Sequence, residues 1–206
     1  MNGARIKKGL NAIASIDKHV AKALEIYGYP KSRIQPAGFE TFLRTIVSQQ
    51  ISNKAAASIF SKVKALLPEC NAAALLALRD EQLRSAGLSQ RKAEYAKGLA
   101  QMIVSGEFDP DALNKMSDVD AIATITQLRG FGQWSAEIYL MFSLGRPDIF
   151  PADDLILQTA LQKIKRLRAR PTPKVAREKV AHWSPWRSAG SLFLWHVHHN
   201  TTVKKK

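Results

Sequence analysis

The sequence predicts an all-α protein built from about ten short helices, and three observations carry this prediction. Apolar residues recur with a period near 3.6 along most of the chain. The nine prolines fall between these periodic stretches, where each ends one helix before the next begins. Strand-like alternation flanked by hairpin turns is missing, which argues against a large sheet. The predicted helices cover 10–27, 38–48, 52–66, 89–104, 119–127, 134–143, 155–167, 174–182 and 186–197.

Small polar residues mark where three of these helices begin. Ser52 and Ser89 stand directly before helix-forming runs, and Ser117 or Asp118 precedes the run that ends at Gln127. A side-chain oxygen at this position accepts a hydrogen bond from a free amide of the first helical turn. The helix boundaries and the periodicity therefore agree with one another.

Length and composition limit the class of protein. The 206 residues fit one domain or two small lobes that share a core. Cys70 is a single cysteine, so the chain forms no internal disulfide and no four-cysteine iron–sulfur cluster. The apolar stretches are too short to span a membrane, and the N-terminal segment lacks the apolar run of a secretory signal. We expect a reducing, cytosolic location and no membrane partner.

The charge balance points to a polyanion partner. Lys and Arg number 31 against 17 Asp and Glu, which gives a formal net charge of +14. Residues 163–187 alone carry nine basic side chains and one acid, Glu178. Such an excess is typical of nucleic-acid binding, and the alternative is a basic surface that only contacts solvent.

The segment Leu128–Ala136, LRGFGQWSA, lies between two predicted helices and contains two glycines one residue apart. Glycine permits a positive φ and a close approach of other backbone. Amides at the start of the following helix are then available to bind a phosphate. The G-x-G pattern alone is equally typical of an ordinary corner between two helices.

Two adjacent carboxylates, Asp153 and Asp154, follow Pro151 and open the next apolar helix. Acids at this position often serve only as helix caps, because the N-terminus of a helix favours negative charge. A carboxylate held near DNA can also stabilise the positive charge that develops on a sugar as its base departs.

Five segments, in this order along the chain, together resemble the helix-hairpin-helix (HhH-GPD) DNA glycosylase superfamily, and most closely its AlkA-type 3-methyladenine DNA glycosylase II group. The first two, Phe42–Ser52 and Gly87–Tyr95, are similar to the patterns R-x-I-x-x-Q-Q-x-S and G-L-S-x-x-K-A-x-Y. The hairpin and the Asp153–Asp154 pair are the next two. The last is Pro185–Ser188, which is followed by Trp195. The resemblance covers about residues 38–198, and the chain is too short for the extra N-terminal β-domain of longer members.

The resemblance implies a single glycosylase unit over 1–206 with two helical lobes and a cleft between them. One lobe is expected at about 37–135, with much of the hairpin. The other is expected at about 1–36 together with 136–200, and 201–206 forms a basic tail that frays.

The resemblance also implies roles for individual residues. Asp154 matches the catalytic aspartate, and Asp153 matches the neighbour that caps the helix. Trp134 and Trp195 match aromatic side chains that stack on an electron-poor alkylated base. Gln50, with Ile51 beside it, matches the side chain that fills the gap left by a flipped nucleotide. The residues expected to contact DNA are Gly130, Phe131, Gly132, Gln133, Trp134, Gln50, Ile51 and Lys54.

The resemblance further implies a monovalent cation, Na⁺ or K⁺, held at the hairpin by the main-chain carbonyls of Thr126, Leu128 and Phe131. No other cofactor is implied, and no iron–sulfur cluster is expected. Members that also cut the DNA backbone carry a lysine nucleophile where this chain has Trp134, so Schiff-base chemistry lacks its amine here.

The sequence therefore predicts a monomeric, monofunctional DNA glycosylase of base excision repair. It would flip alkylated bases, of the 3-methyladenine and 7-methylguanine type, out of duplex DNA and hydrolyse their glycosidic bonds. The expected location is the nucleoid or the nucleus. Two other interpretations stay open: a glycosylase for other damaged bases, and a helix-hairpin-helix module that binds DNA without catalysis. The roles of Arg187, Gln49 and Glu137 also stay open.

Overall fold

The computed structural model describes residues 1–203, and within them it has twelve α-helices, two short 3-10 helices and no strand. The predicted all-α class is confirmed. Lys204–Lys206, the end of the expected basic tail, lie outside the described residues. No helix in the described part of the chain is long and apolar enough to cross a membrane.

The chain divides into two compact units of contacts. Unit 2 is continuous and comprises Gln35–Ser135, whereas unit 1 combines Met1–Ile34 with the chain from Ala136 onward. Helix α9 (Gln133–Phe142) begins in unit 2 and continues into unit 1. The two ends of the sequence therefore build one unit together.

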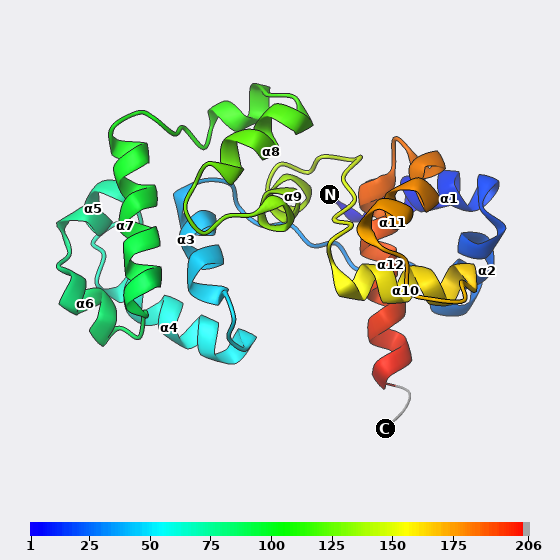
Figure 1. Ribbon diagram of the computed structural model, residues 1–206, viewed down its shortest axis with the longest axis horizontal. Helices are drawn as coiled ribbons and strands as arrows, with labels where there is room; N and C mark the ends of the chain where they lie inside the picture. Colours follow the sequence, from blue (N-terminus) through cyan, green and yellow to red (C-terminus); the bar gives the residue numbers. More distant parts are fainter. Residues whose placement is uncertain (204–206) are drawn as a thin grey trace. The chain divides into compact units, whose positions relative to one another are not determined.

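Unit 2 contains a buried core in which most side chains are aliphatic. Helix α7 packs against α3, α5 and α6, and α3 also packs against α4 (Figure 1). Leu43, Val47, Phe60, Val63 and Leu83 are almost fully buried in this core. The helices are α3 (Phe39–Ser48), α4 (Asn53–Ala65), α5 (Ala72–Ala77), α6 (Asp80–Ser85), α7 (Gln90–Val104) and α8 (Asp118–Thr126), with the 3-10 helix η1 at Ala112–Lys115.

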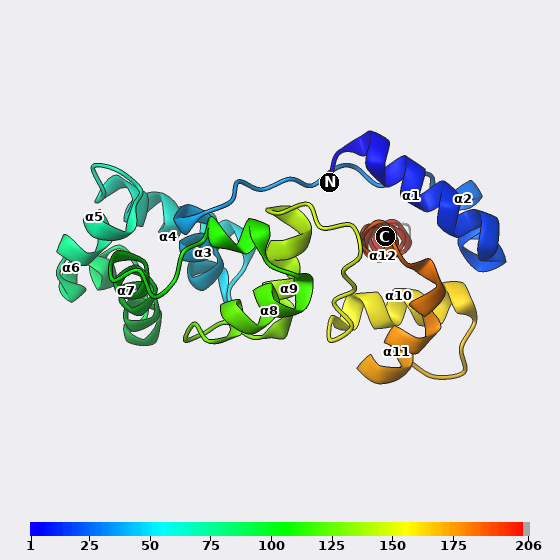
Figure 2. The same ribbon diagram turned by 90° about the horizontal axis from the view of Figure 1, so that it is seen from above.

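Unit 1 is organised around its C-terminal helix, α12 (Arg187–Val203). Figure 2 shows α12 end-on, with α1 and α2 on one side and α10 and α11 on the other. Leu10 and Ile13 of the first helix, and Leu161 and Phe193 from the C-terminal part of the chain, are fully buried. The remaining helices are α1 (Gly3–Ile16), α2 (Lys18–Tyr27), α10 (Leu155–Lys165), α11 (Pro173–Lys179) and the 3-10 helix η2 (Ala181–Trp183).

The structure divides the predicted helix 10–27 into α1 and α2 at Asp17. The Asp17 amide donates to the carbonyl of Ile13 at 2.9 Å, which closes α1. Its carboxylate accepts from the amides of His19 (3.1 Å) and Val20 (3.4 Å), which caps α2. Both helices keep one apolar face, so the periodicity continues across the break.

Other boundaries differ for local reasons. The helices α5 and α6 have six residues each, too few for a periodic pattern to show. Helix α10 ends at Lys165 because Arg166 takes a left-handed conformation with φ 54°. Helix α12 continues through Val203, beyond the start of the expected fraying tail. The serine caps are confirmed, since Ser52, Ser89 and Ser117 accept hydrogen bonds from amides three residues ahead.

Candidate active site

Asp154 is held by three hydrogen bonds at the N-terminus of α10. Its Oδ1 accepts from the backbone amides of Ile156 (2.8 Å) and Leu157 (3.0 Å). Its Oδ2 accepts from the indole N–H of Trp195 at 3.3 Å. The residue is only partly buried. A helix N-terminus favours negative charge, so the carboxylate is held in place at the start of α10.

The expectation that Asp153 caps this helix is wrong, because Asp154 is the cap. The Asp154 amide donates to the carbonyl of Pro151 at 3.0 Å, and this turn leaves Asp153 outside the helix. Asp153 is exposed and pairs with Arg177, whose Nη2 lies 3.2 Å from its Oδ2. The same guanidinium lies 3.7 Å from Oε1 of the buried Glu137. Arg177 is a neighbour of the site that sequence reasoning missed.

Trp195 and Asp154 are brought together by the packing of α12 against α10. The Trp195 ring is partly buried and tilts against Phe142, with 5.8 Å between the ring centroids. The indole of Trp195 therefore makes two contacts. Its N–H donates to the Asp154 carboxylate, and its ring packs on Phe142. The stacking of Trp195 on a base stays a prediction.

The hairpin between α8 and α9 depends on Gly130 more than on Gly132. Gly130 has φ +89°, and a Cβ added there would lie 2.4 Å from the ring of Tyr95. Gly132 has no positive φ, and a Cβ at that position would meet nothing within 4 Å. Gly130 therefore forms the turn, whereas Gly132 leaves open space in front of the helix that follows.

Gln49 fixes this hairpin to the end of α3. Its Nε2 donates to the carbonyl of Gly130 at 2.8 Å. Nearby, Nζ of Lys92 donates to the carbonyl of Val47 at 2.7 Å, and burial together with the positive charge of Arg91 lowers the pKa of Lys92. Gln49 and Lys92, which belong to the two sequence patterns, thus serve as structural donors, a role that spacing alone could not assign.

The three carbonyls expected to hold a cation belong to the last turn of α8 and the hairpin. The carbonyl of Leu128 accepts from the Phe131 amide at 3.0 Å, which closes the turn. Carbonyls at a helix C-terminus lack partners from the helix itself, so oxygens of this kind suit a monovalent cation. The side chains of Leu128 and Phe131 are buried, and the Phe131 ring packs edge-on to Phe42 at 5.4 Å. The cation stays a prediction.

The remaining expected DNA contacts are at the surface of unit 2. Gln50 is exposed with φ +59°, an uncommon conformation for a residue with a side chain. Ile51 is 37% exposed and Trp134 is 44% exposed, high values for large apolar side chains. Lys54, Gln133 and Gly132 are also exposed. Trp134 and Asp154 belong to different units.

Arg187 has a structural role in unit 1. Its guanidinium makes two hydrogen bonds to Asp148, from Nε at 2.8 Å and from Nη2 at 2.7 Å. Burial raises the pKa of Asp148, but hydrogen bonds from Arg187 and Ser184 outweigh it and hold that pKa below its usual range. The role of Arg187, which the sequence left open, is therefore to form a bidentate ion pair with Asp148.

Residues 43–185 match the family model of the HhH-GPD superfamily base excision DNA repair proteins. The chain belongs to the HhH-GPD superfamily. The matched range includes the Gln49 loop, the hairpin and Asp154, whereas Trp195 and Arg187 lie beyond its C-terminal end.

Relatives in this HhH-GPD superfamily resemble the chain over most of its length. DNA-3-methyladenine glycosylase 1 of Schizosaccharomyces pombe is 30% identical over 182 residues, 86% of this chain and 80% of that protein. A structure of the S. pombe 3-methyladenine DNA glycosylase in complex with abasic DNA matches with a TM-score of 0.80 and 28% identity, covering 91% of this chain and 95% of that one. A DNA-3-methyladenine glycosidase of Bacillus halodurans matches with a TM-score of 0.85 and 29% identity, covering 95% and 91%.

Proposed function

We propose that this chain is a monofunctional DNA glycosylase of base excision repair that releases alkylated bases from duplex DNA. Membership in the HhH-GPD superfamily and the names of its relatives support the reaction class. The observation that carries the proposal is the Asp154 carboxylate, oriented at the start of α10 by two amides and the Trp195 indole.

Asp154 acts on the sugar in this proposal. As the bond between C1′ and the base breaks, the bonding electrons leave with the base and positive charge develops on the sugar. The fixed carboxylate stabilises that charge and orients a water, whose oxygen forms the new bond at C1′ and whose proton passes to the carboxylate. The products are a free base and an abasic site. A base alkylated on a ring nitrogen is already cationic, so it leaves without needing a proton donor.

Trp134 and Trp195 select the base in this proposal. A cationic base stacked on an indole gains roughly 0.5–2 kcal/mol per contact, more than a neutral base gains. With Trp134 at this position we expect no strand cleavage, because an indole offers no amine for a Schiff base. Lesions with neutral bases would require hydrogen-bond partners matched to their edges.

The hairpin binds the backbone of the duplex. Amides around Gly130, Gly132 and Trp134 would contact a phosphate, and the carbonyls of Thr126, Leu128 and Phe131 would hold Na⁺ or K⁺, whose charge adds to that of the amides. Gln50 and Ile51 would fill the space left by the flipped nucleotide, with Lys54 beside them on the backbone. The chain would act as a monomer on damaged duplex DNA in the nucleoid or the nucleus.

The test compares the parent chain with Asp154→Asn on alkylated duplex DNA. Asparagine is as good a helix cap as aspartate, so the variant keeps the fold while losing the charge. We expect release of 3-methyladenine to fall by roughly 100-fold or more, with binding to undamaged duplex retained. Asp153→Asn is the matched control, since it removes a neighbouring exposed carboxylate and should leave release nearly unchanged.

Released bases are resolved by chromatography, and the DNA is examined for strand breaks before and after alkali. Breaks that appear only after alkali agree with hydrolysis without lyase activity. If the parent binds DNA but releases no methylated base, the alkylation proposal fails and a substrate with other damaged bases, or a non-catalytic binding role, replaces it.

A further inference from the structure

Gln158 is a buried polar residue of α10 and lies one turn after Asp154. A buried amide is costly unless its hydrogen bonds are made. The apolar stripe of α10 runs through Leu157, Leu161 and Ile164, and an apolar side chain at position 158 would serve packing equally well. In the part of the chain that the structure describes, the buried polar or charged side chains, aromatic ones aside, are Asp17, Thr41, Glu137, Gln158, Ser188 and Ser191.

The side chain of Gln158 binds the main chain directly ahead of the Asp154 carboxylate. Its Nε2 donates to the carbonyl of Ala152 at 2.7 Å, and Ala152 is fully buried. The backbone amide of Gln158 donates to the carbonyl of Asp154 at 3.1 Å. Gln158 therefore contacts the chain two residues before Asp154 through its side chain, and Asp154 itself through its backbone.

The start of the same segment is fixed from α12. The Ser188 hydroxyl accepts from the amide of Ile149 at 2.9 Å. The same helix carries Trp195, whose indole donates to the Asp154 carboxylate. Gln158 adds a tie from α10 to the stretch of chain between these two contacts.

Loss of the Gln158 amide would take this donor from the buried Ala152 carbonyl. A buried acceptor without a partner is costly, so the carbonyl gains free energy by turning toward water. Such a rotation changes the backbone angles of Ala152 and Asp153, and it therefore moves the carboxylate of Asp154. Because a catalytic group acts from a defined position, a displacement of about 1 Å is enough to slow a reaction.

We propose that Gln158 is a positioning residue, which fixes the Ala152 carbonyl and so holds the carboxylate of Asp154 where it acts on the sugar. The proposal rests on the proposed function for the reaction itself, whereas the contact between Gln158 and Ala152 is independent of it. Gln158 is buried and acts through Asp154, so its loss should slow base release and leave the affinity for DNA in place.

The test uses Gln158→Met, because methionine has a similar length and fills a core but has no amide to donate. We expect single-turnover release of 3-methyladenine from alkylated duplex to slow by roughly 10- to 100-fold, with unchanged affinity for undamaged duplex. Gln158→Ala is a second variant and should slow release in the same way. The space it leaves admits a water, which binds the Ala152 carbonyl without tying it to α10.

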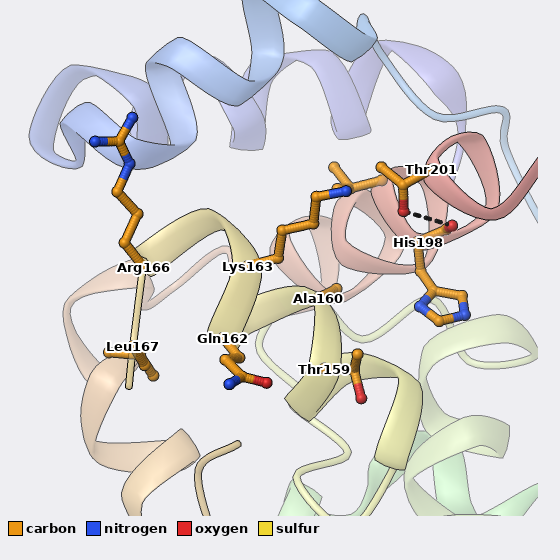
Figure 3. A pocket seen from close by; sticks show the side chains of 9 residues that line it. Thr159, Ala160, Gln162, Lys163, Arg166, Leu167, His198 and Thr201 are labelled. Carbon is orange, nitrogen blue, oxygen red and sulfur yellow. Dashed lines mark hydrogen bonds between the residues drawn. The ribbon is translucent and has the colours of Figure 1, made fainter. Parts of the chain in front are cut away.

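The matched control is Gln162→Met, the same substitution one turn further along α10. Gln162 is partly buried, and its side chain lines a groove between α10 and α12 (Figure 3). The control removes an amide from the same helix, away from the Ala152 carbonyl. Base release should therefore stay at the parent rate.

Nuclear magnetic resonance adds a measurement that needs no DNA. The chain has four tryptophans, and Trp195→Phe identifies the indole N–H signal that belongs to the donor to Asp154. Gln158→Met should shift the Trp195 signal, because the carboxylate that this indole binds has moved. The other indole signals should stay in place, which shows that the variant is folded. Gln162→Met should shift none of them.

The proposal is overturned if Gln158→Met releases base at the parent rate, or if Gln162→Met slows release as much. It is equally overturned if release slows while the Trp195 signal stays in place, or if the affinity for DNA falls as far as the rate. A parent chain that binds DNA but releases no base contradicts the proposed function instead. The Trp195 signal of Gln158→Met then decides alone whether Gln158 positions the carboxylate.

Discussion

At the scale of single residues, the two carboxylate oxygens of Asp154 have different partners. Oδ1 satisfies two backbone amides of α10, which is the task of a helix cap. Oδ2 accepts from Trp195, so the same side chain is oriented from a second helix. The energy that holds the carboxylate in place thus comes from the fold, and the charge needs no reorganisation during the reaction.

Trp195→Phe tests whether the indole N–H positions this carboxylate. The substitution keeps an aromatic ring against Phe142 and removes only the donor to Oδ2. A hydrogen bond to a charged group contributes about 1.5–3 kcal/mol, so base release should slow by roughly 10- to 100-fold if the bond is needed in the transition state. Single-turnover release from alkylated duplex measures this. The control is Trp186→Phe, which changes a partly buried tryptophan directly before α12 and should leave the rate of base release unchanged.

A second measurement separates positioning from base stacking. If Trp195 acts only as a platform for the base, phenylalanine replaces it with little loss of rate, and the substitution Trp195→Leu is harmful instead. Equal rates for the parent and Trp195→Phe would therefore contradict the positioning role.

The adjacent pair Asp153 and Asp154 shows what sequence can resolve at this scale. Pattern and resemblance selected this segment, and the structure places a carboxylate there that is held by three hydrogen bonds. Capping preference is the same for both residues, so it could not say which one caps. The turn from Pro151 decides it, and the ion pair of Asp153 with Arg177 depends on residues 24 positions apart. Contacts of that kind leave no periodic signal.

At the scale of elements, the hairpin is a turn held from two sides. Tyr95 of α7 packs where a Cβ of Gly130 would lie, and Gln49 binds the Gly130 carbonyl from the end of α3. The glycine pattern predicted the turn from local preference alone. It treated Gly130 and Gly132 alike, because the close approach of Tyr95 exists only after α7 has packed.

Gly130→Ala should destabilise the hairpin, whereas Gly132→Ala should be tolerated. The first substitution meets both a positive φ and the Tyr95 ring, with a cost of about 1–3 kcal/mol for the backbone conformation alone. The second adds a methyl group to open space. Chemical denaturation measures both, and affinity for undamaged duplex should fall with the first. Similar stabilities for the two variants would show that the turn adjusts to a side chain.

Asp17 joins three elements of unit 1. It caps α2, pairs with Lys165 at the end of α10 and accepts hydrogen bonds from His182 (3.0 Å) and Trp183 (2.7 Å) of η2. Burial raises the pKa of Asp17, but the hydrogen bonds from Lys165, Trp183 and His182 outweigh it and hold that pKa well below its usual range. The ionised form therefore stabilises the folded state.

Asp17→Asn should lower the free energy of unfolding at pH 7 by about 3 kcal/mol, because it leaves Lys165 without its buried partner. A depressed folded-state pKa contributes stability that is present above the unfolded pKa, about 3.9, and is lost as pH falls below it. The difference between parent and variant should therefore be constant from pH 7 to about pH 5 and shrink at lower pH. Chemical denaturation followed by tryptophan fluorescence measures the free energy of unfolding of both proteins at each pH. The control is Asp153→Asn, which changes an exposed carboxylate. A difference that does not change with pH would contradict this account.

At the scale of the whole molecule, the chain closes one unit by bringing its two ends together. Unit 2 takes all its residues from the middle of the sequence, whereas unit 1 needs both Met1–Ile34 and the chain from Ala136. Helix periodicity predicted most of the elements of both units. It could not show that Leu10 and Ile13 are buried with Leu161 and Phe193, since that pairing depends on packing across more than a hundred residues.

This division predicts that residues 35–135 fold alone and that residues 136–206 do not. The first fragment keeps the whole core of unit 2, which is large enough for an independent domain. The second lacks α1 and α2, whose buried Ile6, Leu10, Ile13 and Val20 face α10 and α12 in the intact chain. Circular dichroism should show a cooperative unfolding transition for 35–135 and none for 136–206 until a peptide of residues 1–34 is added. Cooperative unfolding of 136–206 by itself would show that α10 and α12 form a sufficient core, and that the N-terminal helices only cover it.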